Sequence, residues 1–342
     1  MIIVMEPKAS ENQIQAVVNY LESNGFKSVL NRGDIMTVIA AIGDRKLFQP
    51  QAVASYEGVR EVKLISEPYK LASREGQPDD TVIEFDNGVK LGGKNRPQMM
   101  VGPCCVEKDI DGLLRVAEAA KECGCNILRG GAFKPRTSPY DFQGYEEKAL
   151  EFLKIASEKT GMLIVTEVMD TLDLPLICKY ADIIQIGARN MQNFKLLKAA
   201  GQTGKPVMIK NGPAATIREF LLAAEYVLST GNPKVILCER GVKGFDSTYT
   251  RNTLDIAAIP VIKKYSHLPV IVDPSHGTGR RYLVESLAKA GLVVGANGVM
   301  MEVHHDPDRA SSDGAQSLTI EQFKQTMKRL NRLMDIMEEE SI

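Results

Sequence analysis

The sequence predicts an α/β protein in which a small ferredoxin-like βαββαβ domain precedes a (β/α)₈ TIM barrel. From residue 99 onward, short apolar strands alternate with helical segments eight times within about 245 residues, the number of units in that barrel. Before residue 67, the predicted elements follow the order of the split βαβ unit. A doubly wound open sheet is the alternative for the larger part, but no G-x-G-x-x-G opens a helix after its first strand.

The smaller predicted domain covers residues 1–66. Its first strand is the apolar run 2–5, and Ser10 with Gln13 forms a capping box before a helix with apolar residues at helical spacing. Two strands flank the turn Asn31-Arg32-Gly33-Asp34, a helix follows around residues 46–56, and the last strand ends at Ile65. With few chemically functional side chains, such a domain is more often regulatory or oligomer-forming than catalytic.

A connector at residues 67–97 joins this domain to the barrel at 98–342. It contains a predicted β-hairpin, because Asn87-Gly88 between two short apolar runs tolerates the positive φ of a tight turn. The eight barrel strands that follow are predicted at 99–102, 126–128, 163–166, 183–186, 206–209, 235–237, 270–272 and 298–301. Helices fill the gaps, for example at 112–123, 145–160, 217–229 and 281–290.

Composition excludes several classes of function. The 342 residues carry 42 basic and 43 acidic side chains, and no Lys/Arg-rich run indicates a nucleic-acid partner. No apolar run is long enough to span a membrane, and residues 1–5 lack the basic start of a signal peptide. The six cysteines show no disulfide framework, so we expect reduced thiols in a cytoplasmic protein.

Polar side chains follow every predicted strand, at the barrel end where active sites lie. The most concentrated group is the stretch 129–138 after the second strand, where three cations and two hydroxyls beside glycines predict a cradle for a phosphorylated anion. The other strand ends carry Cys104-Cys105, Glu167, Arg189, Lys210, Glu239-Arg240, Asp273 with His276, and Glu302, with Asp313 in the last loop.

These residues divide into two chemical sets. Cys104, His276, Glu302 and Asp313 suit a divalent transition metal better than Mg²⁺ or Ca²⁺. His304 and His305 are alternatives for the imidazole ligand. His267 precedes the predicted strand at 270–272, at the opposite end of the barrel, and is expected to be structural. The second set contains six cations that predict two phosphate-bearing substrates, or one with a carboxylate as well: Arg129, Lys134, Arg136, Arg189, Lys210 and Arg240.

Six motifs resemble those of the 3-deoxy-D-arabino-heptulosonate 7-phosphate (DAHP) synthase family. They are Gly-Pro-Cys at 102–104, Leu-Arg-Gly-Gly-Ala-Phe-Lys-Pro-Arg-Thr-Ser at 128–138, Gln-Ile-Gly-Ala-Arg-Asn at 185–190, Cys-Glu-Arg-Gly at 238–241, Asp-Pro-Ser-His at 273–276 and Ser-Asp-Gly-Ala-Gln-Ser-Leu at 312–318. The resemblance implies condensation of phosphoenolpyruvate, erythrose 4-phosphate and water to DAHP and phosphate, the entry reaction of the shikimate pathway. The alternative is the sister enzyme that makes 3-deoxy-D-manno-octulosonate 8-phosphate from arabinose 5-phosphate, but Lys-Pro-Arg-Thr-Ser favours the four-carbon sugar.

The resemblance also implies roles for individual residues. Phosphoenolpyruvate would be bound by Arg129, Lys134, Arg189, Lys210 and Arg240, and erythrose 4-phosphate by Arg136 and Thr137. One divalent metal ion (Mn, Fe, Co or Zn) would be held by Cys104, His276, Glu302 and Asp313. Cys105 stands where the family commonly has serine, and the place directly after Gly-Pro favours Cys104 as the ligand.

Two further expectations concern mechanism and regulation. Lys134 is the expected general acid at the aldehyde oxygen, and Glu167 either orients and deprotonates the attacking water or forms a structural salt bridge with an arginine. The resemblance of the first domain implies feedback inhibition by an aromatic amino acid and a homotetramer. Two rival interpretations are a ligand sensor without chemistry and a metal-dependent pyruvate aldolase.

Overall fold

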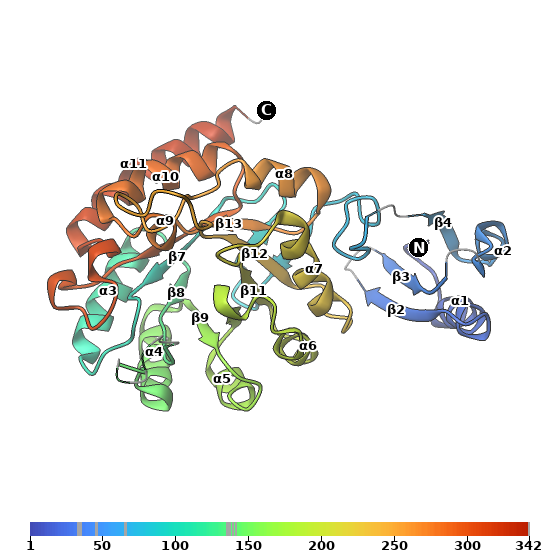
Figure 1. Cartoon of the computed structure of the whole chain (residues 1–342), viewed down its shortest axis with the longest axis horizontal. Coiled ribbons are helices and arrows are strands. Elements are labelled where there is room, and N and C mark those ends of the chain that lie inside the picture. Colours follow the sequence, from blue (N-terminus) through green and yellow to red (C-terminus); the bar gives the residue numbers. More distant parts are fainter. Residues whose placement is uncertain are drawn as a thin grey trace.

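The larger part of the chain is a closed barrel of eight parallel strands, which confirms the predicted fold class (Figure 1). The computed structural model describes residues 1–32, 36–44, 47–64, 67–134, 138, 140 and 142–340. The barrel strands are β7 (Gln98–Gly102), β8 (Ile127–Arg129), β9 (Leu163–Val168), β10 (Ile183–Ile186), β11 (Val207–Lys210), β12 (Val235–Glu239), β13 (Val270–Val272) and β14 (Gly298–Glu302).

Helices surround the barrel because each strand leads into an amphipathic segment that buries its apolar stripe on the sheet. Two of these helices start at capping boxes, formed by Thr216 with Glu219 and by Thr319 with Gln322. The helices are α3 (Ile110–Glu122), α4 (Glu146–Thr160), α5 (Leu174–Tyr180), α6 (Phe194–Gln202), α7 (Ile217–Leu228), α8 (Ala258–Tyr265), the short α9 (Pro274–Thr278), α10 (Arg281–Val293) and α11 (Ile320–Glu339). Among these described helices, none combines the length and apolarity needed to cross a bilayer.

A hairpin closes the amino-terminal end of the barrel. Strands β5 (Val82–Glu84) and β6 (Lys90–Gly92) pair in antiparallel fashion. Their side chains Ile83 and Leu91 are buried in one cluster with barrel-interior residues such as Met100 and Ile236. Since this end is filled by apolar side chains, the opening at the carboxyl ends of the strands is left for chemistry.

The first domain is a four-stranded antiparallel sheet in the order β2-β3-β1-β4, as the βαββαβ prediction requires. Its elements are β1 (Ile2–Met5), α1 (Glu11–Ser23), β2 (Lys27–Arg32), β3 (Thr37–Ile42), α2 (Pro50–Ala54) and β4 (Val59–Lys63). The predicted capping box of Ser10 and Gln13 is present. Residues Gly33, Asp34 and Ile65 of the predicted turn and last strand lie outside the described residues.

The two faces of this small sheet have different partners. Ile3 and Met5 of β1 pack with apolar residues of α1, whereas Ile2 and Val4 belong to the same buried cluster as Tyr69 of the connector and the barrel helices. Figure 1 accordingly shows the sheet beside the barrel, with α1 and α2 on the side away from it. The first domain is therefore packed against the barrel through one sheet face.

Two polar side chains, the half-buried Glu225 and the buried His267, hold the connector on the barrel. The carboxylate of Glu225 on α7 accepts hydrogen bonds from the backbone N–H groups of Lys70, Leu71 and Ala72, each at 2.9 Å. His267, which precedes β13, lies 2.7 Å from Thr81 Oγ1 through Nδ1 and 2.7 Å from the Leu71 carbonyl through Nε2. These contacts give His267 the structural position expected of it, at the amino-terminal end of the barrel strands.

Candidate active site

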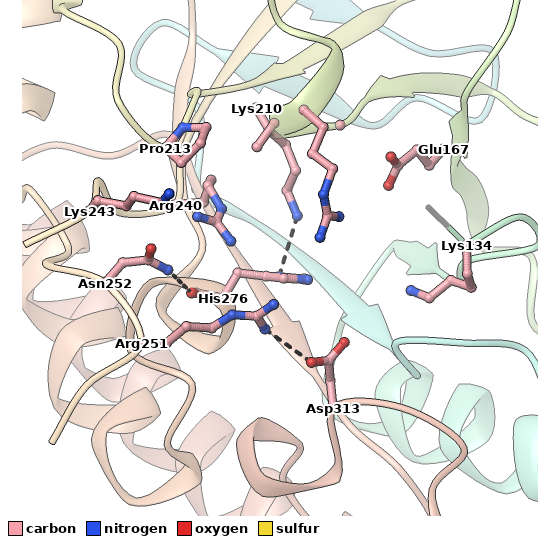
Figure 2. Close-up of a pocket in the computed structure, with 13 residues that line it drawn as sticks. Lys134, Glu167, Lys210, Pro213, Arg240, Lys243, Arg251, Asn252, His276 and Asp313 are labelled. Carbon is pink, nitrogen blue, oxygen red and sulfur yellow. Dashed lines mark hydrogen bonds and ion pairs between the residues drawn. The ribbon is translucent and has the colours of Figure 1, made fainter. Parts of the chain in front are cut away.

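A cavity of about 550 Å³ opens at the carboxyl ends of the barrel strands (Figure 2). Figure 2 shows Lys134 and Glu167 on one side of this cavity and Arg240, Lys243 and Asn252 on the opposite side. Its lining is strongly cationic: Lys134, Glu167, Gly187, Ala188, Arg189, Lys210, Pro213, Arg240, Lys243, Arg251, Asn252, His276 and Asp313. Such a surface fits anionic ligands.

Three predicted metal ligands meet at one edge of the cavity. Cys104, just beyond β7, His276 on α9 and Glu302 at the end of β14 each offer one ligand atom, and these atoms all lie within 4.8 Å of one another. The side chains of Cys104 and Glu302 are buried, and His276 is half-buried. A sulfur, an imidazole nitrogen and a carboxylate oxygen form a donor set suited to a borderline or soft divalent ion.

Asp313, the fourth predicted ligand, lies beside this group rather than within it. Its Oδ2 accepts a hydrogen bond from Cys104 Sγ at 3.0 Å, and its Oδ1 pairs with Arg251 Nη1 at 3.0 Å. The residue adopts the left-handed conformation, with φ 52°. Burial acts to raise the pKa of Asp313, but Cys104, His276 and Arg251 lower it to about 2, so the carboxylate is ionised.

Asp273 determines how His276 presents its ring. Nδ1 of His276 lies 2.6 Å from Asp273 Oδ2, and the backbone N–H of His276 donates to Asp273 Oδ1 at 2.9 Å. This fixes a proton on Nδ1 and directs Nε2 toward Glu302 Oε1, 3.2 Å away. Burial acts to lower the pKa of His276, but the negative charges of Asp273 and Glu302 raise it. A metal ion would therefore displace the Nε2 proton and accept that nitrogen's lone pair.

Glu302 is held by three neighbours in the buried floor of the site. Its Oε1 accepts from Arg129 Nη1 at 2.8 Å, and its Oε2 accepts from Gln316 Nε2 at 2.7 Å. Burial acts to raise the pKa of Glu302, but His276 and Arg129 lower it. Nε of Arg129 is buried without a hydrogen-bond partner among the described residues, as expected of a donor reserved for a ligand.

The two adjacent cysteines point to different partners. Cys104 Sγ accepts a hydrogen bond from Lys134 Nζ at 3.0 Å, whereas Cys105 Sγ lies 2.6 Å from the hydroxyl of Ser312. The interaction with Cys105 and burial raise the pKa of Cys104 well above its usual range, so the thiol stays protonated until an ion displaces the proton. This geometry agrees with the expectation that Cys104, rather than Cys105, is the ligand.

The predicted cations occupy two levels. Arg189, Lys210 and Arg240 line the cavity, whereas Arg129 is buried below it against Glu302. Lys210 also donates to Asp273 at 2.7 Å. Arg136 and Thr137, the predicted contacts of erythrose 4-phosphate, lie outside the described residues.

Glu167, on β9, faces the cavity. Its Oε2 accepts from Gln185 Nε2 at 2.9 Å, and the carboxylate packs so closely on Gly187 that a Cβ there would overlap Oε1. In the described part of the chain no salt bridge joins Glu167 to an arginine, which was the structural alternative. The carboxylate is thus available to a ligand.

Sequence reasoning missed several residues of this site, and it placed His304 near it. Lys243, Arg251 and Asn252 come from the long loop after β12, several residues beyond the strand end, and Gln316 follows Asp313 on a short 3₁₀ turn. Gln316 stands inside a recognised motif, which is the one signal that could have indicated it. His304 pairs instead with Glu107 at 3.4 Å and stacks on His305, outside the three-ligand group.

A family model described as "DAHP synthetase I family" matches residues 80–339, and one described as "DAHP synthase ferredoxin-like domain" matches residues 1–67. The chain belongs to the DAHP synthetase I family. This membership confirms the family predicted from the motifs, together with the subgroup that carries a ferredoxin-like first domain.

Relatives support the same membership over the whole chain. A phospho-2-dehydro-3-deoxyheptonate aldolase of Thermotoga maritima is 49% identical over 335 residues, which is 98% of each chain. The crystal structure of the DAHP synthase of that organism superimposes with a TM-score of 0.78 at 48% identity, covering 98% of this chain and 97% of that one. More distant is a 2-dehydro-3-deoxyphosphooctonate aldolase of Syntrophotalea carbinolica, 32% identical over 71% of this chain and 92% of its own length.

Proposed function

We propose that this chain is a metal-dependent DAHP synthase, which condenses phosphoenolpyruvate with erythrose 4-phosphate and water to give DAHP and phosphate. The observation that carries the proposal is the group formed by a buried thiol, a half-buried imidazole and a buried carboxylate at the edge of a cavity lined by cations. Membership of the DAHP synthetase I family supports it. The reaction is the first step of the shikimate pathway to chorismate and the aromatic amino acids.

The metal would be held by Cys104, His276, Glu302 and Asp313. The donor set fits Mn, Fe, Co or Zn, because Asp273 keeps the His276 proton on Nδ1 and leaves Nε2 for the ion. When bound, the ion supplies Lewis acidity that polarises the aldehyde oxygen of the sugar.

Phosphoenolpyruvate would lie against the cationic wall of the cavity. Arg189, Lys210 and Arg240 would neutralise its phosphate and carboxylate, and the unpartnered Nε of Arg129 offers one further buried donor. Holding the two reactants in this cavity places the nucleophilic C3 of phosphoenolpyruvate against C1 of the aldehyde. Arg136 and Thr137 are proposed to hold the phosphate of erythrose 4-phosphate.

Lys134 is the proposed general acid. Burial acts to lower its pKa, but the neighbouring Cys104, Cys105 and Glu302 raise it, so the amine carries a proton. As the C3–C1 bond forms, Lys134 donates that proton to the aldehyde-derived oxygen. Positive charge develops at C2 of the phosphoenolpyruvate, and water adds there.

Glu167 is the proposed group that orients or deprotonates this water. It faces the cavity from the same side as Lys134, and its hydrogen bond from Gln185 leaves one carboxylate oxygen for the water (Figure 2). The C2–O bond to phosphate then breaks, and the arginines stabilise the departing anion.

The same proposal covers the rest of the chain. Residues 1–66 would form a regulatory domain that binds an aromatic amino acid and takes part in a homotetramer, 67–97 a connector, and 98–342 the catalytic barrel. None of the six cysteines, which all lie among the described residues, forms a disulfide, which supports a reducing, cytoplasmic environment.

The test is phosphate release by the purified chain with phosphoenolpyruvate, with and without erythrose 4-phosphate. Release should require both substrates, should stop when the metal is removed by a chelator, and should be absent in Cys104→Ala and His276→Ala. Cys178→Ala, on α5 away from the cavity, serves as the matched control. Full activity of metal-stripped protein, or faster reaction with arabinose 5-phosphate than with erythrose 4-phosphate, would contradict the proposal.

A further inference from the structure

Arg251 connects the anion cavity to the candidate metal ligands. It lies in the loop between β12 and α8, and its backbone is held by a hydrogen bond from its N–H to the Thr278 carbonyl at 2.8 Å. Its side chain is 44% exposed, reaches beneath His276 and ends at Asp313 (Figure 2). Because Arg251 itself lines the cavity, one side chain contacts both regions.

The guanidinium of Arg251 is only partly satisfied. Nη1 donates to Asp313 Oδ1 at 3.0 Å and to Gln316 Oε1 at 3.2 Å. Within the described ranges of the chain, Nε and Nη2 have no hydrogen-bond partner. A planar fork with free donors in a cavity lined by cations is suited to a phosphate or carboxylate.

Both acidic ligand candidates depend on this side chain. Asp313 pairs through Oδ1 with Arg251, whereas its Oδ2 accepts only from the Cys104 thiol, a hydrogen bond that ends when an ion displaces the thiol proton. Gln316 is buried, accepts from Arg251 and donates to Glu302 Oε2 at 2.7 Å. Arg251 therefore sets the position of Asp313 directly and that of Glu302 through Gln316.

We propose that Arg251 couples anion binding in the cavity to closure of the metal site, by exchanging Asp313 for the phosphate of a substrate. While Arg251 pairs with Asp313, it holds that carboxylate beside the three-ligand group, and its charge opposes the entry of a cation. With an anion in the cavity, the guanidinium pairs with that anion, and Asp313 is released to become the fourth ligand. The inference rests on the proposed metal site and adds to it an order of assembly.

The coupling has a thermodynamic consequence. If an anion strengthens metal binding by releasing Asp313, the metal must strengthen anion binding by the same factor. The phosphate of phosphoenolpyruvate would then bind best to protein that already holds its ion. Arg251 acts in this account as a positioning residue.

Lys243 provides the matched control. It lines the same cavity and comes from the same loop, but among the residues described here its ammonium group has no ion-pair partner. Lys243→Ala should weaken the binding of an anion. It should leave unchanged the ratio of the metal affinity with the anion bound to the metal affinity without it. Arg251→Ala should change the ratio itself.

The experiment is a titration of the metal-stripped full chain with Co²⁺, followed by the near-ultraviolet charge-transfer absorption of a thiolate–cobalt bond. Each titration is done in sodium sulfate, whose tetrahedral dianion stands in for phosphate, and in sodium chloride of equal ionic strength. We expect sulfate to tighten Co²⁺ binding about fivefold or more in the wild type and in Lys243→Ala. In chloride, Co²⁺ should bind more tightly to Arg251→Ala than to the wild type. The factor by which sulfate strengthens Co²⁺ binding should fall to about one in this variant.

A second variant keeps the test informative if Arg251→Ala fails to fold. In Asp313→Asn, where Arg251 is intact but no carboxylate can be released, sulfate should no longer strengthen Co²⁺ binding. If sulfate strengthened Co²⁺ binding in Arg251→Ala or Asp313→Asn as much as it does in the wild type, the inference would be overturned, while the proposed metal site would stand. Absence of the charge-transfer band in the wild type would instead refute the metal site itself.

Discussion

Replacing Asp273 by asparagine should weaken metal binding, although Asp273 is not itself one of the proposed ligands. Asp273 is fully buried, and its Oδ2 receives both His276 Nδ1 at 2.6 Å and Lys210 Nζ at 2.7 Å. In Asp273→Asn, Oδ1 can still accept from the His276 N–H, but the amide NH₂ then faces two donors. The His276 ring would shift its proton to Nε2, the nitrogen that the ion needs.

The expected losses of metal affinity and of stability follow from these contacts. Loss of a partner that orients a ligating histidine lowers metal affinity about 10- to 100-fold, which is roughly 1.4–2.8 kcal/mol. The ammonium group of Lys210 also loses its buried counter-charge, and removing one partner of such a pair lowers the free energy of unfolding by about 3–5 kcal/mol. The variant should therefore be less stable and also less able to bind its ion.

The assay pairs a Co²⁺ titration with urea unfolding of the metal-stripped protein. Asp182→Asn is the control, because Asp182 is a carboxylate before β10 that accepts from the Ile164 N–H at 2.7 Å, at the other end of the barrel. It should leave Co²⁺ affinity unchanged. Co²⁺ affinity of Asp273→Asn within twofold of wild type would refute the role assigned to Asp273.

Three further predictions concern pH, the connector and Glu167. Burial lowers the pKa of His267 to about 4 from its usual 6.5, so the unfolded chain takes up a proton before the folded protein does as the pH falls. The free energy of unfolding should therefore fall by about 3 kcal/mol as the pH drops from 6.5 to 4. In urea titrations, His267→Asn should lose this part of the pH dependence. Glu225→Gln places an amide NH₂ against a backbone donor of the connector and should lower the free energy of unfolding by about 1–3 kcal/mol. An unchanged midpoint and slope of the urea unfolding curve would show that the connector is held by other contacts. Gly187→Ala pushes a Cβ into the Glu167 carboxylate and should reduce kcat about tenfold or more. The thermal unfolding midpoint should stay within a few degrees of the wild-type value. A kcat equal to that of the wild type would exclude Glu167 from the reaction.

Much of the fold could be predicted because each local signal agrees with the tertiary arrangement. Apolar runs become buried barrel strands, as in β12, where all five residues are buried. The capping box at Ser10 and the Asn87-Gly88 turn use short-range chemistry that the sequence displays directly. The predicted limits of the barrel strands at 183–186 and 270–272 match the structure, and those of the other six differ by one or two residues, since hydrogen bonding in the barrel decides them.

The candidate site was predictable where function follows a strand end and unpredictable where it depends on partners across loops. Cys104, His276 and Glu302 each stand at or just beyond a strand, so barrel topology alone brings them to one rim. Arg251 meets Asp313 across 62 residues of sequence, and no spacing rule links the two loops. By contrast, Lys210 and Asp273 are 63 residues apart but both stand at strand ends, so barrel topology brings them to the same rim. The Arg251–Asp313 pair depends on loop conformations that hydrophobic periodicity does not specify.

The most direct test of the account is a crystal structure of the chain with Mn²⁺ and phosphoenolpyruvate, with the ion located by its anomalous scattering. We expect one ion bonded to Cys104 Sγ, His276 Nε2, Glu302 and Asp313, with the phosphate of phosphoenolpyruvate against Arg189 and Arg240. An ion bound elsewhere, or phosphoenolpyruvate bound outside this cavity, would contradict it.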